Sequence, residues 1–217
     1  MKLFLDSYNP EHIKELLFID MVQGISVTPS PEMSKQDYDL KLQEIIELCR
    51  SYKDGIPLNI KIFAEQPERI LTQAIDMAKD LSYDKLILQI PFSFKNLHTI
   101  SALSQMGTAV NVTGCVNAMQ MQTVKSPKYV SFDWGQVEDT DIALNSITEV
   151  RRYYYHNQIE CDIIVENVAE AENISKLWTS GAGIVSADYI TIKESIYDDR
   201  TEESRAKFIK DYKNWMS

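Results

Sequence analysis

Eight short apolar segments alternate with longer amphipathic segments along the whole chain. The apolar segments are rich in β-branched and aliphatic residues, as buried strands are. They are Lys2–Asp6, Gly24–Thr28, Pro57–Ala64, Lys85–Pro91, Thr108–Thr113, Lys128–Asp133, Cys161–Glu166 and Gly183–Ala187. Strands that alternate with helices form a parallel sheet with the helices outside it, and eight such units close a barrel. The sequence therefore predicts an α/β fold, a single (β/α)8 TIM barrel.

The amphipathic segments supply the outer helices of this barrel. We expect helices over Pro10–Ile19, Tyr38–Tyr52, Pro67–Leu81, Phe94–Met106, Asn117–Val124, a segment from the acidic loop Glu138–Asp141 to His156, Ala169–Ser180 and Glu202–Trp215. Residues 1–200 would form the barrel and residues 201–217 an additional C-terminal helix. On that last helix Phe208, Tyr212 and Trp215 form an apolar stripe, which must pack either on a neighbouring subunit or back on the same barrel.

Composition narrows the classes of partner. The net charge of −10 and the pI near 4.8 argue against binding to nucleic acid or to an anionic membrane, because both surfaces are negative. The charged N-terminal segment does not resemble a signal peptide and no segment is long and apolar enough to span a membrane, so we expect a cytoplasmic protein. The three cysteines have no metal-type spacing and the three histidines lie far apart in predicted helices, so we expect no metal site.

Polar residues lie where several predicted strands end. In barrels of this kind the active site lies at the carboxyl ends of the strands. The strand-end set comprises Asp6, Thr28, Lys61, Gln89, Thr113, Asp133 and Glu166. On the strand Pro57–Ala64, period-two alternation predicts that Asn59, Lys61 and Phe63 share the face that points into the barrel. Gln89 is a polar residue among apolar neighbours, so it must be hydrogen-bonded or functional.

An inward-facing lysine among carboxylates allows more than one interpretation. The Lys61 amine could form a Schiff base with a carbonyl compound while a carboxylate moves the proton. An amine attacks only in its uncharged form, however, and three nearby carboxylates favour the charged form. Alternatively, Lys61 forms a buried salt bridge with Asp6 or Glu166 and has no role in chemistry. Asp133 could equally cap the loop that follows its strand.

Motifs along the whole chain resemble those of the small transaldolases and fructose-6-phosphate aldolases, which are class I aldolases on a (β/α)8 barrel. Leu88–Pro91 is similar to the Val-Lys-Ile-Pro motif of that family, and Gly24–Ser30 to its Gly-Val-Thr-Thr-Asn-Pro-Ser motif. Further similar segments are Phe4–Asp6, Asn111–Thr113 through Gln120, and Tyr129–Ser131. The resemblance implies this fold, aldolase chemistry without a cofactor, and a homo-oligomer built through the last helix.

The resemblance also identifies departures from the family pattern. The Schiff-base lysine of the family falls on Gln89, which cannot form an imine, while Lys61 stands where the family has a glutamine or glutamate that holds a catalytic water. The two residue types have exchanged strands. Asp6 and Thr113 match the proton-handling aspartate and the water-holding threonine of the family.

The substrate-binding positions differ as well. Thr28 stands in place of an asparagine, Asp133 of a tyrosine, Gln136 of the phosphate-binding arginine and Glu166 of a phosphate-binding serine. Loss of a guanidinium and gain of carboxylates disfavour a phosphate ester. A neutral polyol, an amino sugar or another cationic compound suits these positions better.

Three functional hypotheses follow. In the first, the chain is an aldolase-like enzyme of carbohydrate metabolism, with Lys61, Asp6, Gln89, Thr113 and Glu166 as catalytic residues. Thr28, Asn59, Asp133 and Gln136 would then bind a small carbonyl or polyol substrate. In the second, the barrel has lost catalysis and serves as a binding or regulatory protein. In the third, the carboxylates and hydroxyls catalyse an isomerisation or dehydration without an imine.

Overall fold

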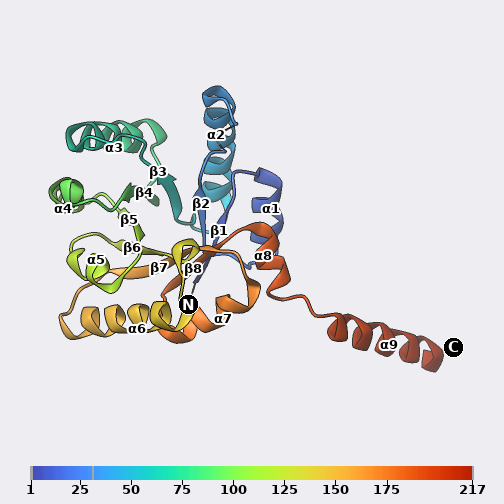
Figure 1. Cartoon of the computed structure of the whole chain (residues 1–217). Helices are drawn as coiled ribbons and strands as arrows, with labels where there is room; N and C mark the ends of the chain where they lie inside the picture. Colours follow the sequence, from blue (N-terminus) through green and yellow to red (C-terminus); the bar gives the residue numbers. More distant parts are fainter. Residues whose placement is uncertain (1, 31, 217) are drawn as a thin grey trace.

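The eight predicted strands form a closed barrel in a computed structural model that describes residues 2–30 and 32–216 (Figure 1). Every strand pairs in parallel with the next, and β8 pairs with β1. The strands are β1 (Lys2–Asp6), β2 (Gly24–Val27), β3 (Leu58–Lys61), β4 (Leu86–Pro91), β5 (Val110–Cys115), β6 (Tyr129–Asp133), β7 (Asp162–Val168) and β8 (Ile184–Ala187). The predicted (β/α)8 TIM barrel with a C-terminal helix is confirmed.

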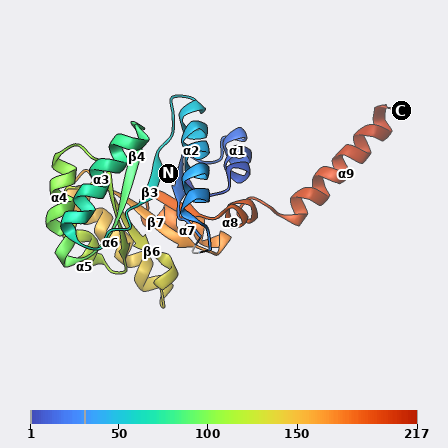
Figure 2. The same cartoon turned by 90° about the horizontal axis from the view of Figure 1, so that it is seen from above.

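Helices follow the strands and surround the barrel (Figures 1 and 2). They are α1 (Pro10–Phe18), α2 (Lys35–Ser51), α3 (Pro67–Leu81), α4 (Leu97–Gln105), α5 (Ala118–Thr123), α6 (Thr140–His156), α7 (Ala171–Ser180), α8 (Tyr189–Glu194) and α9 (Asp199–Met216), with short 3-10 turns η1 (Phe94–Asn96) and η2 (Trp134–Gln136). Helix α8 was not predicted. Helix α9 begins at Asp199, earlier than the predicted Glu202.

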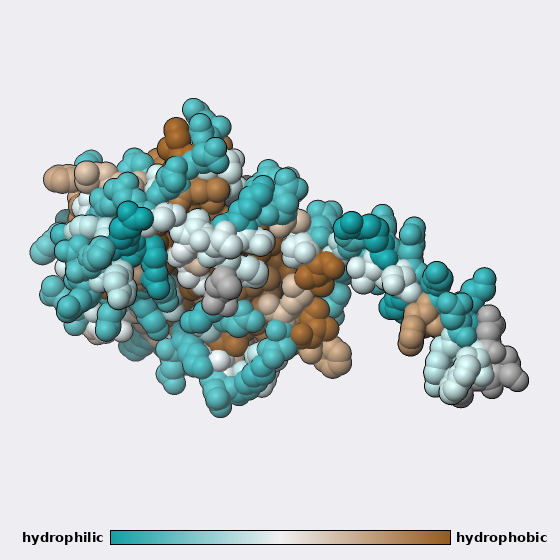
Figure 3. Space-filling view, turned by 90° about the horizontal axis from the view of Figure 1, so that it is seen from below, coloured by the Kyte–Doolittle hydropathy of each residue, from teal (hydrophilic) through white to brown (hydrophobic). Residues whose placement is uncertain are grey.

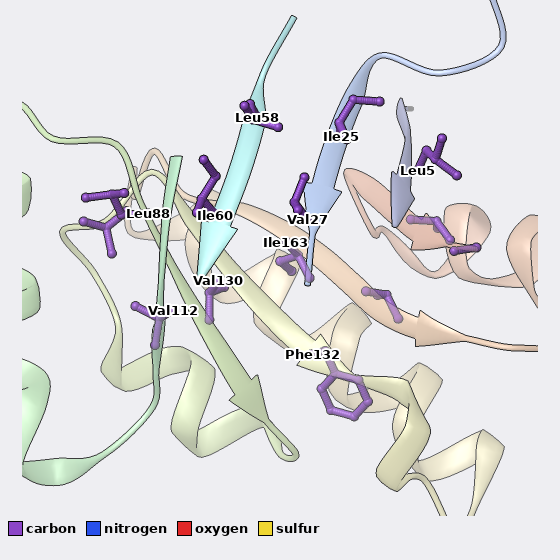
Figure 4. Packing of buried hydrophobic residues seen from close by; sticks show 14 of the residues in the cluster. Leu5, Ile25, Val27, Leu58, Ile60, Leu88, Val112, Val130, Phe132 and Ile163 are labelled. Atoms are coloured by element: carbon purple, nitrogen blue, oxygen red, sulfur yellow. The ribbon is translucent and has the colours of Figure 1, made fainter. Parts of the chain in front are cut away.

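The outward faces of the strands form the main hydrophobic core against the helices. Figure 4 shows Ile25, Leu58, Ile60 and Leu88 packed in this layer, and all four are fully buried. Burial of one such side chain stabilises a fold by roughly 1.5–3 kcal/mol. Phe63, predicted to face inward, instead lies beyond the end of β3 and is 53% exposed. Its strand ends at Lys61, so the period-two alternation stops before Phe63.

The amino-terminal end of the barrel interior is apolar. It holds a separate buried cluster of Phe4, Ile87, Tyr129, Ile164 and Ile184. Gly24 makes room for the Phe4 ring, because a Cβ atom at Gly24 would lie 2.3 Å from that ring. This cluster fills the amino-terminal part of the interior, so we expect polar chemistry towards the carboxyl ends of the strands.

Helix α9 stands clear of the barrel. Figures 1 and 2 show it projecting from the body after α8, and Figure 3 shows a mostly hydrophilic surface along it. Apart from residues 214, 216 and 217, whose side chains are not described, every residue from 200 onward is exposed. The apolar stripe therefore does not pack back on its own barrel. Within the described residues, no helix combines the length and apolar character needed to cross a membrane.

Candidate active site

The barrel interior also carries a set of buried polar side chains, called the middle layer here. Its six side chains are Ser26, Asn59, Gln89, Asn111, Ser131 and Ser186. The register of the sheet places part of this set beside the apolar cluster, since Asn59 pairs with Ile87 and Asn111 with Tyr129. Interiors of such barrels are normally filled by bulky branched residues. Polar side chains beside and beyond the apolar cluster therefore mark the carboxyl end of the barrel as the place where a polar ligand can be received.

Hydrogen bonds satisfy only part of this layer. Asn59 Nδ2 donates to Ser26 Oγ at 3.3 Å, and Ser131 Oγ donates to Asn111 Oδ1 at 2.9 Å. Asn59 Oδ1 and Asn111 Nδ2 are buried without a partner among the described residues. The Gln89 side chain, only 4% exposed, also makes no hydrogen bond within residues 2–30 and 32–216. Buried polar atoms are nearly always paired, so these amides leave hydrogen-bonding capacity unused in the interior.

Lys61 ends β3 above this layer. It is half-buried and is the register partner of Gln89 on β4. Among the described residues its amine takes part in no ion pair and no side-chain hydrogen bond. The alternative in which Lys61 is locked in a salt bridge with Asp6 or Glu166 is therefore not observed.

Asp6 lies at the end of β1, partly buried. Burial raises the pKa of its carboxyl to about 6; the positive charge of Lys61 opposes this increase and the negative charge of Asp188 adds to it. Asp188 caps α8 by accepting a hydrogen bond from Thr191 N at 2.8 Å. Near neutral pH, Asp6 can therefore exchange a proton.

Glu166 lies on β7, and burial raises the pKa of its carboxyl to about 7. A hydrogen bond from Gly114 N to Glu166 Oε1, at 3.2 Å, opposes this increase, as do Ser131 and Lys61, while Asp133 adds to it. Gly114 has φ +74°, a conformation that favours glycine, at a register shift between β5 and β6. The irregular end of β5 thus positions the Glu166 carboxyl.

Asp133 is the register partner of Glu166 on the neighbouring strand β6. Its Oδ1 atom accepts hydrogen bonds from Gly135 N at 3.1 Å and from Asn167 Nδ2 at 2.7 Å. Asp133 therefore caps η2, as the structural interpretation expected, and its charge still acts on Glu166. Capping and an electrostatic role in the site coexist in this residue.

The remaining predicted site residues lie at different depths. Thr113 is buried at 6% exposure on the interior face of β5, whereas Thr28 lies one residue beyond β2 and is half-buried. Gln136 is exposed in η2. The charge of Lys61 acts on both Asp6 and Glu166, whereas Gln136 contributes to the pKa of neither carboxyl.

Sequence reasoning missed five residues of this region: Ser26, Asn111, Ser131, Ser186 and Asp188. The first four alternate with apolar residues along β2, β5, β6 and β8, so the period-two pattern that identified Asn59 could have found them. Asp188 follows β8 and caps a helix that was not predicted. Its effect on Asp6 depends on the closure of β8 against β1.

Comparison with known proteins places the chain among aldolases. The model of the family described as transaldolase/fructose-6-phosphate aldolase matches residues 3–216. A protein named "Probable transaldolase" from Alkaliphilus metalliredigens is 25% identical, covering 98% of this chain and 98% of its own length. Another protein of that name, from Dehalococcoides mccartyi, is 27% identical over 99% of both chains.

Solved structures show the same fold. An N-acetylneuraminate lyase from Mycoplasma synoviae superposes with a TM-score of 0.59 and 16% identity, covering 95% of this chain and 76% of that one. A structure described as a putative fructose-1,6-biphosphate aldolase from Coccidioides immitis gives a TM-score of 0.61 and 15% identity, covering 86% of this chain and 76% of that one. On the match over residues 3–216, the chain belongs to the transaldolase/fructose-6-phosphate aldolase family.

Proposed function

We propose that this protein is an aldolase-like enzyme that makes or breaks a C–C bond next to a carbonyl through an imine on Lys61. The observation that carries the proposal is the register of β3 and β4, in which Lys61 pairs with Gln89. The resemblance places the Schiff-base lysine of the family on Gln89. Because register partners are neighbours on adjacent strands and share one face of the sheet, the exchange moves the amine by one strand within the carboxyl end of the barrel.

The surroundings of Lys61 support nucleophilic chemistry. No carboxylate of the described residues forms an ion pair with the amine. The two carboxyls that act on it electrostatically, Asp6 and Glu166, have pKa values raised to about 6 and about 7 by burial. Near neutral pH these two carboxyls can therefore exchange protons with a compound bound at Lys61.

The reaction can be written with these groups. Nζ of Lys61 attacks the carbonyl carbon, and loss of water gives an iminium ion. A carboxylate, Asp6 or Glu166, removes the proton from the β-hydroxyl group. The C–C bond then breaks, its electrons form an enamine, and an aldehyde leaves. Addition of the enamine to an aldehyde reverses these steps. Gln89 and Thr113 would hold hydroxyl groups or water.

Substrate binding would involve Thr28, Asn59, Asp133 and Gln136. No cation other than Lys61 contributes to the electrostatics of Asp6 or Glu166 among the described residues. A phosphate ester at these positions would meet carboxylates and no guanidinium, so an ordinary sugar phosphate is a poor substrate.

Borohydride trapping tests the proposal. The protein is incubated with small carbonyl compounds such as hydroxyacetone, reduced with borohydride, and digested for mass spectrometry. We expect an adduct on Lys61 that is absent in Lys61→Met and present in Lys95→Met, a control at an exposed lysine of η1. If no carbonyl compound modifies Lys61 in the folded protein, the imine mechanism is wrong.

A second candidate is acid–base catalysis of isomerisation or dehydration without an imine. The two carboxyls with raised pKa values, Asp6 and Glu166, favour it, since each can donate and accept a proton near neutral pH. Turnover that survives Lys61→Met and disappears in Asp6→Asn would select this candidate. If neither reaction occurs, the barrel is a binding or regulatory protein.

A further inference from the structure

The carboxyl end of the barrel carries an excess of negative groups. Asp6 and Glu166 are the two carboxyls with raised pKa values, and the negative charges of Asp188 and Asp133 add to this rise. The amine of Lys61 is the one positive charge that opposes it among the described residues. We infer that the substrate carries an ammonium group, bound on the β6–β7 side between Asp133 and Glu166, together with hydroxyl groups that reach the polar middle layer. This inference rests on the proposed function for the carbonyl chemistry alone.

Glu166 and Asp133 form the part of the site that would bind the ammonium group. The two residues are register partners on adjacent strands, and both are half-buried. Each carboxyl has one oxygen held by a backbone N–H group, Glu166 by Gly114 and Asp133 by Gly135. A carboxylate has about four acceptor positions, so both residues keep capacity for an ammonium donor.

The interior amides of β3, β4 and β5 are a second, independent sign of a ligand. Gln89 is only 4% exposed, and its side chain makes no hydrogen bond within residues 2–30 and 32–216. Asn59 Oδ1 and Asn111 Nδ2 are also unpaired among the described residues. The complete amide of Gln89 on the interior face suits a hydroxyl group of a polyol, and the unpaired atoms of Asn59 and Asn111 lie deeper in the same interior. An amino polyol therefore fits both parts of the site.

Binding of an ammonium group should release protons. The pKa of Glu166 is raised to about 7 by burial, so this carboxyl is partly protonated in the free protein near neutral pH. A cation beside it favours the ionised form and lowers its pKa. A neutral polyol has no such effect, so proton release distinguishes recognition of the ammonium group from binding of hydroxyl groups.

Calorimetry on the full chain tests the inference with three probes that lack a carbonyl group: 2-amino-2-deoxyglucitol, glucitol and glucitol 6-phosphate. At pH 7 we expect the amino polyol to bind about tenfold more tightly than glucitol, as charge-assisted hydrogen bonds imply, and the phosphate ester to bind more weakly than either. Titrations in buffers of different ionisation enthalpy should show proton release for the amino polyol alone.

Two variants locate the effect. Glu166→Gln keeps an oxygen for the Gly114 N–H group but removes the charge, so the preference for the amino polyol should fall to less than about threefold. Asp133→Asn keeps an acceptor for Gly135 and Asn167 and should reduce the preference as well. Glu68→Gln, on an exposed carboxylate of α3, makes the same change in net charge and should preserve the preference.

The outcomes separate this inference from the imine mechanism. Equal or weaker binding of the amino polyol than of glucitol, or an unchanged preference in both folded Glu166→Gln and Asp133→Asn, overturns the inference. The probes cannot form an imine, so a failure of borohydride trapping leaves these results intact. Trapping on Lys61 without a preference for the amino polyol would contradict only the substrate class proposed here.

Discussion

Lys61 on β3 and Gln89 on β4 are register partners. Adjacent strands lie about 4.8 Å apart, so an amine at either position starts from a neighbouring point on the interior face of the barrel. We predict that Lys61→Gln loses the borohydride-trapped adduct and that the double variant Lys61→Gln/Gln89→Lys regains it on residue 89. A displacement of the amine of a few ångströms should leave the double variant about 10²-fold slower than the wild type. Time courses of trapping measure both effects.

The interpretation of this exchange depends on the single variants. Gln89→Lys alone places two amines on neighbouring strands and should give an adduct on either residue. Lys95→Gln serves as the control for loss of a surface lysine from η1 and should react as the wild type does. A folded double variant that gives no adduct would show that the two positions are not equivalent.

The titration of Glu166 should make stability depend on pH. Its pKa is raised from 4.5 to about 7 in the folded chain by burial. The folded state therefore binds more protons than the unfolded state between pH 4.5 and about 7, and the free energy of unfolding falls as pH rises through this window. The contribution of Glu166 to this fall is at most about 3 kcal/mol.

Glu166→Gln removes this contribution. Urea unfolding at pH 5, 6, 7 and 8 should show a smaller loss of stability with pH in the variant than in the wild type. Asp6 adds a fall of the same sign between pH 3.8 and about 6, and it is present in both proteins. Glu68→Gln should follow the wild-type curve. Parallel curves for Glu166→Gln and the wild type would mean that the Glu166 carboxyl ionises normally.

Gly114 provides a more local prediction. At φ +74°, an alanine is strained by about 1–2 kcal/mol, and the backbone must shift to relieve that strain. The hydrogen bond from Gly114 N to Glu166 Oε1 lowers the pKa of Glu166, and such a shift weakens this bond. We predict that Gly114→Ala raises this pKa further. NMR titration of labelled glutamate carboxyls measures the change, and urea unfolding measures the loss of stability.

Gly107 is a matched control for this substitution. It has φ +85°, and a Cβ atom at either glycine would meet nothing within 4 Å. Gly107→Ala should therefore cost a similar free energy of unfolding without moving the titration of Glu166. An equal shift of the Glu166 pKa in both variants would show that general destabilisation, and not the hydrogen bond, causes it.

The sequence predicted the fold because every strand has its own apolar run and every connection is short. It also predicted that Asn59 and Lys61 share one face of β3, and the structure has Asn59 fully buried inside the barrel. The alternation could not predict that β3 ends at Lys61, so the prediction that Phe63 faces the barrel interior is wrong. Strand ends depend on pairing with neighbours, which local periodicity does not contain.

The electrostatics of the site could not be predicted from sequence. The pKa of the Glu166 carboxyl depends on burial and on a hydrogen bond from Gly114, which lies 52 residues away in the chain. The effect of Asp188 on Asp6 requires the closure of β8 against β1. These interactions exist only in the closed barrel. The residue types at the strand ends, by contrast, are evident from the sequence alone.

The aromatic stripe of α9 is the remaining feature without a partner. Phe208, Tyr212 and Trp215 are 70%, 50% and 75% exposed, and their rings stack along the helix with centroids 6.3 Å and 5.6 Å apart. Exposed apolar stripes of this kind are characteristic of protein interfaces. We propose that a neighbouring copy of the chain covers the stripe, in line with the homo-oligomer that the resemblance implies.

Light scattering tests this proposal on the full chain. Phe208→Asp/Tyr212→Asp replaces two aromatic rings with charges, and burial of each ring is worth roughly 1.5–3 kcal/mol. We therefore expect the variant to dissociate from an oligomer towards the monomer mass while the barrel keeps its thermal transition. Lys210→Asp lies on the opposite face of α9, about 200° around the helix from Phe208, and should remain oligomeric. A monomeric wild type, or an oligomer unaffected by both aspartates, would show that α9 is not the subunit contact.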